Sequence, residues 1–254
     1  MKVRIKFSKQ GNLRFVGHLD MMRYFQKAFR RSGLPISYSE GFSPHQIMSF
    51  AAPLGMGLEG LGEYFDIRVP DEGTPVRSDE AVERLNDEMA EGLKILSYLA
   101  IPDETGNCMA AVHAADYTVR FLTKKKKETA SDVPEDFRVN GGASGAGISA
   151  ALSSALSSLL EKPEILVTKK GKKGNLREVD LRPMIFSARA EGPELKMNIA
   201  QGSEANLKPE LFLEALYAAD AGGTLKDCRT AVVRTELYDS EGKALEAYGS
   251  RIEN

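Results

Sequence analysis

The chain has 254 residues, enough for one large domain or for two smaller ones that each bury a hydrophobic core. Its composition of 42% hydrophobic and 28% charged residues is typical of a soluble globular protein and excludes a disordered or fibrous chain. The formal net charge of −2 does not by itself indicate a polyanionic partner.

The cysteine content and the N-terminus indicate a compartment. Cys108 and Cys228 are too few for a disulfide framework and lie in no metal-ligand spacing, so we expect a reducing environment and no metal site. The first residues alternate charged and apolar side chains where a signal peptide has an apolar run, and no stretch reaches 18 apolar residues. We therefore expect a cytoplasmic protein without a membrane partner.

The first hundred residues predict six elements. Val3, Ile5 and Phe7 alternate with charged side chains, which is the period of a half-buried strand. The elements run strand, helix, strand, strand, helix, strand. The strand over 2–8 and the helix over 18–31 are followed by short extended pieces at 36–39 and 47–52 around a turn, then by the strand 62–69, the helix 78–91 and the strand 93–101. The core stripe expected for the first helix is Leu19, Met22, Phe25 or Gln26, and Phe29. Ser78 is the expected N-cap of the second helix.

The second half repeats this order with one extra strand. Its expected elements are strand 116–122, helix 148–162, strands 164–170, 179–190 and 194–202, helix 209–219 and strand 228–239. The fold class is therefore α+β, with two tandem ferredoxin-like (βαββαβ) halves that have antiparallel sheets. The predicted domains are residues 1–104 and 114–240. The second contains a mobile loop, 123–147, and is followed by a polar tail, 241–254, that frays.

Charge is distributed unevenly along the chain. Residues 1–50 carry nine basic and two acidic side chains, whereas residues 51–104 carry four basic and thirteen acidic ones. A second basic region covers 120–189. The near-neutral total is thus a cancellation between segments of opposite sign.

The first helix has a basic face. Arg23, Lys27 and Arg30 lie at i, i+4 and i+7 on the side away from the expected core, with Arg31 beside them. Arg14 is a further basic residue before the helix. An ordinary surface helix mixes charge signs, but no acidic residue follows Asp20 in this one. The face is either a solvated surface or a binding face for phosphates.

Two polar residues at the start of this helix are the candidate catalytic residues, His18 and Asp20. Because they are two positions apart, they do not face each other on a helix. Asp20 also suits a capping role beside the helix dipole. His18 is either a ligand-facing group or a structural one.

The segment after the helix predicts a rigid polar loop. Gly41 permits a positive φ and Pro44 restricts the residue before it, so the side chains between them have defined positions. The expected substrate-contacting residues are Tyr38, Glu40, Phe42, Ser43 and His45. No nucleophile elbow accompanies them, so a hydrolase is not expected.

A basic hairpin is predicted in the second half. Gly171 and Gly174 join two strands through a tip rich in cations, which is either a solubilising turn or a finger that contacts phosphates. The expected phosphate-contacting residues here are Lys169, Lys170, Lys172, Lys173, Arg177 and Arg182. Asp180 is expected to pair with Arg182 or with the finger. The basic helix and basic finger together favour RNA as a partner.

Several stretches closely resemble the radical-SAM-linked protein family, a bacterial domain found beside or fused to B12-binding radical SAM enzymes. The resemblance is carried by GNLRFVGHLD (11–20), RRSGLPISYSEGFSPH (30–45), SFAAPLG (49–55) and REVDLRP (177–183). It implies a companion that presents a substrate to a separate radical SAM enzyme. The chain itself is expected to hold no cofactor, because a [4Fe–4S] cluster of that type needs a three-cysteine motif.

These observations leave three functions open. The first is an RNA-binding accessory protein without catalytic activity of its own, partnered by a B12-binding radical SAM enzyme. The second is an RNA-modifying enzyme of pseudouridine-synthase-like architecture, with Asp20 as the candidate acid. The third is a protein-docking module that uses the acidic helix, through Glu80, Glu83 and Asp87.

Overall fold

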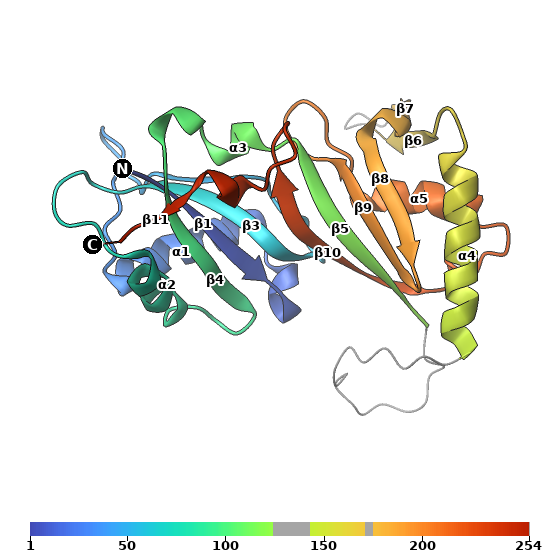
Figure 1. The fold of residues 1–254 in the computed structure, drawn as a ribbon, viewed down its shortest axis with the longest axis horizontal. Coiled ribbons are helices and arrows are strands. Elements are labelled where there is room, and N and C mark those ends of the chain that lie inside the picture. Colours follow the sequence, from blue (N-terminus) through green and yellow to red (C-terminus); the bar gives the residue numbers. More distant parts are fainter. Residues whose placement is uncertain (124–142, 171–174, 254) are drawn as a thin grey trace. The chain divides into compact units, whose positions relative to one another are not determined.

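The computed structural model describes residues 1–123, 143–170 and 175–253 (Figure 1). The fold is α+β, and its sheet is mostly antiparallel. The chain forms two compact units. The first comprises Met1–Asp116, Ala200–Asn206 and Val233–Asn254, and the second comprises Tyr117–Ile199 and Leu207–Val232. No helix within the described residues is long and apolar enough to cross a membrane.

The first unit contains the elements predicted for residues 1–101 in the predicted order. They are β1 (Lys2–Lys9), α1 (His18–Ser32), β2 (Met48–Phe50), β3 (Glu59–Arg68), α2 (Ser78–Asn86) and β4 (Leu93–Ile101). Short 3₁₀ helices, η1 (Gly11–Phe15) and η2 (Asp103–Thr105), and the short helix α3 (Cys108–Ala111) lie between or after them. The C-terminal segment adds the end of β10 (Arg229–Tyr238), η4 (Leu245–Tyr248) and β11 (Ser250–Arg251).

Strands of the first unit pair in the order β11-β4-β1-β3-β10, and β2 also pairs with β3. All of these pairs are antiparallel except β10 with β3, where Arg234 lies opposite Gly60. Glycine at position 62 allows this parallel approach, because a Cβ there would lie 2.5 Å from the carbonyl oxygen of Thr235.

The second unit contains β5 (Ala114–Leu122) from Tyr117 onward, α4 (Ala143–Leu160), β6 (Leu166–Lys170), β7 (Leu176–Asp180), η3 (Arg182–Met184), β8 (Ile185–Glu191), β9 (Glu194–Ala200) and α5 (Pro209–Ala219). The first residues of β10, then β5, β9 and β8, follow one another in its sheet. β6 and β7 form a separate two-stranded sheet. Helix α4 packs against α5 and β8. Residues 124–142 of the predicted mobile loop lie outside the described residues, and residues 143–147 begin α4.

The single strand predicted over 179–190 is wrong, because the chain leaves β7 at Asp180 and enters β8 only at Ile185. Pro183 lies in the intervening turn and has no N–H to donate to a strand ladder. The Asp180 carboxylate accepts the backbone N–H groups of Ile165 (2.8 Å) and Arg182 (3.0 Å). Asp180 therefore closes the turn with backbone bonds instead of pairing with the Arg182 side chain.

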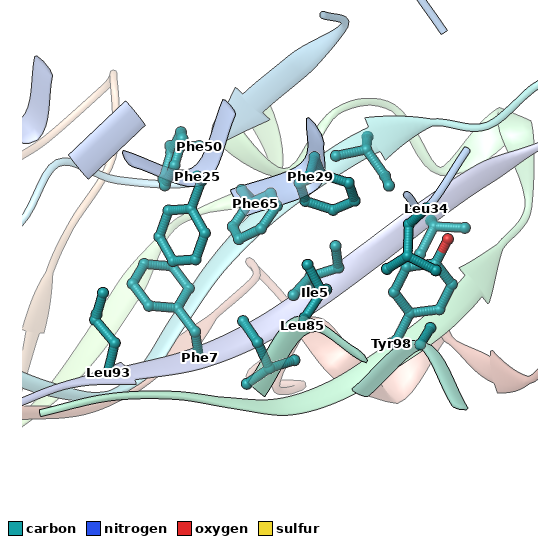
Figure 2. Packing of buried hydrophobic residues seen from close by; sticks show 14 of the residues in the cluster. Ile5, Phe7, Phe25, Phe29, Leu34, Phe50, Phe65, Leu85, Leu93 and Tyr98 are labelled. Atoms are coloured by element: carbon teal, nitrogen blue, oxygen red, sulfur yellow. The ribbon is translucent and has the colours of Figure 1, made fainter. Parts of the chain in front are cut away.

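The hydrophobic core of the first unit lies between β1, β3 and helices α1 and α2, which pack next to each other (Figures 1 and 2). Phe7, Phe25, Phe50 and Phe65 form its aromatic centre, with ring centroids 4.8 to 6.1 Å apart. Such edge-to-face and tilted pairs add to the burial energy of the rings.

The predicted stripe of α1 needs a correction, since Leu19 is 61% exposed. The buried residues are Met21, Phe25, Ala28 and Phe29. Both stripes have helical spacing, so periodicity alone could not choose between them. In α2, Ser78 is the first helical residue and not the N-cap, and its hydroxyl accepts the N–H of Ile252 at 2.8 Å.

The prediction of a fraying tail after Asp239 is wrong. Leu245 of η4 is completely buried, and β11 pairs with β4. This segment covers the charged face of β1, where the Arg4 guanidinium donates to the carbonyl of Leu245 at 2.9 Å. Lys6 lies between Glu236, at 2.7 Å, and Glu246. The tail is ordered because buried cations of β1 need its acceptors.

Candidate functional site

The basic face of α1 is smaller than its sequence predicts. Arg31 pairs with the carboxylate of Glu88 and also donates to that residue's carbonyl at 3.3 Å. Arg23 lies 3.4 Å from Asp20. Within the part of the chain that the structure describes, no acidic side chain pairs with the exposed Lys27 and Arg30.

Arg14 lies on η1, before the helix. Its guanidinium stacks 4.8 Å from the ring centre of Phe15 and approaches the Glu59 carboxylate at 3.3 Å. The Phe15 ring is 61% exposed. Arg14 therefore presents a stacked cation and aromatic pair beside α1.

The loop between α1 and β2 is held at its base. Tyr38 forms an isolated bridge with Gln46, and the Ser39 N–H donates to the His45 carbonyl at 2.8 Å. The Ser39 hydroxyl meets His45 Nδ1 at 2.8 Å and accepts the His45 N–H at 3.1 Å. Ser39, which is not among the loop residues predicted to contact a substrate, is thus the partner of His45.

The tip of this loop is solvent-exposed. Gly41 has a φ of 106°, as the sequence suggested, and the Phe42 ring next to it is fully exposed. Glu40 and Ser43 are exposed as well. Ser43 approaches His45 through its carbonyl oxygen, 3.5 Å from Nδ1, and among the described residues no hydrogen bond joins the Ser43 hydroxyl to the ring.

The predicted basic finger belongs to the second unit, whereas α1 belongs to the first. Lys169 on β6 lies opposite Arg177 on β7, and both are exposed. Lys172, Lys173 and the side chain of Lys170 lie outside the described residues. Arg182 lies on η3, partly buried.

His18 and Asp20 have different surroundings. The His18 ring packs edge-on against Phe50, with centroids 5.2 Å apart. Burial, and then the charge of Lys9, lower the pKa of His18 below its ordinary 6.5. Asp20 is 68% exposed and pairs with Arg23. Gly17 is the N-cap of α1, and no side chain among the described residues caps it, so Asp20 does not fill the capping role.

Next to His18 lies a charged cluster, formed by Lys9 of β1, Glu63 of β3 and Arg234 of β10. Glu63 accepts two bonds from Arg234, one of them from Nε at 2.8 Å. Arg234 also donates to the Ala52 carbonyl at 2.8 Å. Gly60 makes room for this arrangement, because a Cβ there would lie 2.5 Å from the Glu63 carboxylate.

Lys9 is the least compensated member of the charged cluster. The residue is only 3% exposed, and its ammonium group donates to the Val16 carbonyl at 2.8 Å. Burial lowers the pKa of Lys9, Glu63 opposes this effect and Arg234 adds to it. The cluster therefore places a buried cation at the start of α1.

A cavity of about 440 Å³ elsewhere in the first unit is a weaker candidate. Arg4, Gln201 and Asp239 are among its lining residues. Arg4 is bound to Asp66, and Asp239 accepts the N–H groups of Glu241 and Lys243 at 2.9 Å each. These charged groups are already engaged by the protein. In the described ranges, no group of three His, Cys, Asp or Glu side chains is placed to hold a metal ion.

Residues 2–209 match the family described as uncharacterized protein conserved in bacteria (DUF2344). The chain belongs to this family. The matched region of this DUF2344 protein includes Lys9, His18, Glu63 and the loop at 38–45, but not Arg234. A search of curated proteins finds no match.

The charged cluster of the DUF2344 protein was missed in the sequence, although a signal was present. Lys9 follows Phe7 by two positions, and Glu63 precedes Phe65 by two, so each charge has the strand parity of a core residue. A charge at such a position is a candidate for burial. Arg234 carries no comparable signal in a strand that is only partly buried.

Lys9 is expected to contribute, after burial, to the lowered pKa of His18 in this DUF2344 protein. Replacing Lys9 with methionine should raise the pKa of His18, because a neighbouring positive charge is removed. Since the pKa of His18 is lowered by folding, this residue adds stability above about pH 6.5 that is lost as the pH falls toward its folded pKa. NMR titration of the His18 ring measures the shift. The exposed Lys94→Met variant should leave it unchanged, and an unmoved pKa in Lys9→Met would contradict the assignment.

Proposed function

We propose that this protein is an RNA-binding accessory protein that presents its substrate to a separate B12-binding radical SAM enzyme. The observation that carries the RNA part is the pair of exposed cations on α1, Lys27 and Arg30, which lack acidic partners among the described residues. Cations three positions apart on a helix lie side by side and suit neighbouring phosphates.

Exposed aromatic rings in the same unit support single-stranded RNA over a duplex. The Phe42 ring is fully exposed at a loop tip, and the exposed Phe15 ring is stacked by Arg14. Unpaired bases stack on such rings, whereas bases inside a duplex are not accessible to them.

The proposal of a radical SAM partner rests on the resemblance of the sequence to the radical-SAM-linked protein family. The acidic helix α2 supplies a docking surface for it, since Glu83 and Asp87 are exposed and one helical turn apart. Glu80, by contrast, is paired with Arg84 at 3.2 Å.

An arrangement of tandem ferredoxin-like halves is part of the same proposal. It is supported by the neighbour order β4-β1-β3-β2 in the first unit and β10-β5-β9-β8 in the second.

The RNA proposal is tested by reversing both α1 charges, in Lys27→Glu with Arg30→Glu. A binding titration with a single-stranded RNA should show at least about tenfold weaker binding, and the slope of log affinity against log salt should fall by about 1.4 for two lost contacts. Phe42→Ala should weaken binding by about 1–3 kcal/mol without affecting stability, because the ring contacts solvent.

The matched control is Lys94→Glu with Arg251→Glu, which reverses two exposed cations on β4 and β11. This control should lose little affinity. If both double variants lost RNA affinity equally, the net charge of the protein and not the α1 face would explain the loss, and this would contradict the proposal. A wild-type affinity that does not change with salt concentration would also contradict it.

A further inference from the structure

The cavity of about 440 Å³ in the first unit keeps unused hydrogen-bonding capacity, although its charged groups have partners in the protein. Arg4 lies in its wall, and a guanidinium carries five N–H groups. Among the described residues, Arg4 uses three of them: Nε and Nη2 donate to Asp66, and Nη1 donates to the Leu245 carbonyl. One N–H on each terminal nitrogen therefore remains open in a side chain that is 2% exposed. Buried donors of this kind normally have an acceptor.

Asp239 offers an open acceptor in the same lining. Its Oδ1 accepts the N–H groups of Glu241 and Lys243, and its Oδ2 accepts the Tyr248 hydroxyl. Each carboxylate oxygen has two lone pairs, so one position on Oδ2 is unused. Burial opposes the ionisation of Asp239, but the hydrogen bonds that it accepts outweigh this effect and lower its pKa. The carboxylate is therefore charged at neutral pH.

Two further carboxylates make the lining of the cavity negative. Glu104 of η2 and Glu204, which follows β9, are both exposed, and within the described residues neither forms an ion pair. The charge of Arg4 is already balanced by Asp66. A positively charged group of a ligand is therefore favoured near the carboxylates of the lining.

Backbone contacts fix the walls of the cavity. The Gln201 N–H donates to the His113 carbonyl at 2.9 Å, and the His113 N–H donates to the Tyr238 carbonyl at 2.8 Å. Gly202 lies tightly against this junction, because a Cβ there would lie 2.3 Å from the Val112 carbonyl oxygen. Since a water molecule occupies about 30 Å³ in the liquid, the cavity has room for about 15 non-hydrogen atoms.

We propose that this cavity binds a small zwitterion of the free amino acid type, with its carboxylate on the open N–H groups of Arg4 and its ammonium group beside the three carboxylates of the lining. Guanidinium groups bind carboxylates through two N–H groups, and charged partners strengthen both contacts. A simple anion is disfavoured by the negative lining, and a simple cation leaves the donors of Arg4 without an acceptor. The site does not rest on the proposed RNA face of α1.

The test is a titration of the full chain with each of the twenty standard amino acids in turn, followed by the backbone amide signals of Gly202 and Ser203 in NMR spectra. At least one amino acid should shift these signals to saturation. Its N-acetyl derivative lacks the ammonium group and its amide derivative lacks the carboxylate, so each should bind at least about tenfold more weakly. The proposal is wrong if no amino acid saturates the signals, or if either derivative binds as tightly as the parent compound.

Glu104→Gln with Glu204→Gln removes two carboxylates of the lining without removing a buried group. This double variant should bind the amino acid at least about threefold more weakly. The matched control is Glu72→Gln with Glu91→Gln, which makes the same change of net charge at exposed positions outside the cavity. The control should bind like the wild type, and equal affinities of the two double variants would contradict the role of the lining.

Arg4→Lys keeps a cation beside Asp66 but reduces the five N–H donors to three. The folded variant should bind the amino acid at least about tenfold more weakly. Wild-type affinity in this variant would contradict the assignment of the carboxylate to Arg4. The amide derivative tests the same contact in the unaltered protein, so the assignment does not depend on the folding of the variant. Failure of the RNA face is recognised separately, because Lys27→Glu with Arg30→Glu leaves the amino acid titration unchanged.

Discussion

Replacement of Asp66 by alanine is expected to destabilise the first unit by about 3–5 kcal/mol, because it leaves a buried guanidinium without its counterion. Arg4 is 1% exposed and donates to Asp66 from Nε at 2.8 Å and from Nη2 at 3.0 Å. The N–H of Cys108 loses its acceptor at the same time. Urea unfolding followed by circular dichroism measures the loss as a lower midpoint.

The expected loss of stability in Asp66→Ala comes from the unpaired buried charge. Two further variants distinguish this cause from a general loss of packing. Removing both partners, in Arg4→Met with Asp66→Ala, should restore part of the stability, since the buried guanidinium is gone and only the Lys2 ammonium, 3.8 Å from the Asp66 carboxylate, still loses its partner. Asp103→Ala removes an exposed partner of Arg68 and should cost less than about 1 kcal/mol. A double variant as unstable as Asp66→Ala with Arg4 intact would contradict the electrostatic explanation.

The second large effect is expected for Arg234→Met, which leaves Glu63 buried without its two-bond partner. We expect a loss of about 3 kcal/mol, at the lower end for a broken buried pair, because Lys9 interacts electrostatically with Glu63. The same variant should raise the pKa of Lys9, since the charge of Arg234 lowers it. Urea unfolding and NMR titration of the lysine side chain measure the two effects.

Glu63→Gln combined with Arg234→Met should be more stable than Arg234→Met alone, because it removes the uncompensated carboxylate. Arg229→Met changes an exposed arginine on the same strand and should alter stability by no more than about 0.5 kcal/mol. If Arg229→Met and Arg234→Met changed the free energy of unfolding equally, the charged cluster would not stabilise the protein.

Much of the local structure could be predicted from the sequence. The spacing of apolar and charged residues predicts strands β1 and β4 and helices α1 and α2. It also predicts that Lys27 and Arg30 are exposed. The positive φ of Gly41 was predicted from its place in a polar loop. These features depend on contacts between residues that are close in the sequence.

The candidate site could be predicted only in part. His18 was singled out, but its contacts with Phe50 and Lys9 depend on how α1 lies on the sheet. The partner of Arg31 was also unpredictable, because Glu88 lies 57 positions further along the chain. Such pairs reduce the basic face that the helix alone would present.

The sequence by itself determined the type and order of the main elements over residues 1–101, since periodicity and turn residues act within a few positions. Only the tertiary structure decided which charges are buried. Arg4 has the parity of a solvent-facing residue, yet the C-terminal segment covers it through a bond that spans 241 positions. Lys9 and Glu63 become a site only when Arg234 arrives on β10, 171 positions after Glu63. A charge can be buried only where the sheet brings it a partner. These partners lie far away in the sequence, so no local pattern of residues predicts them.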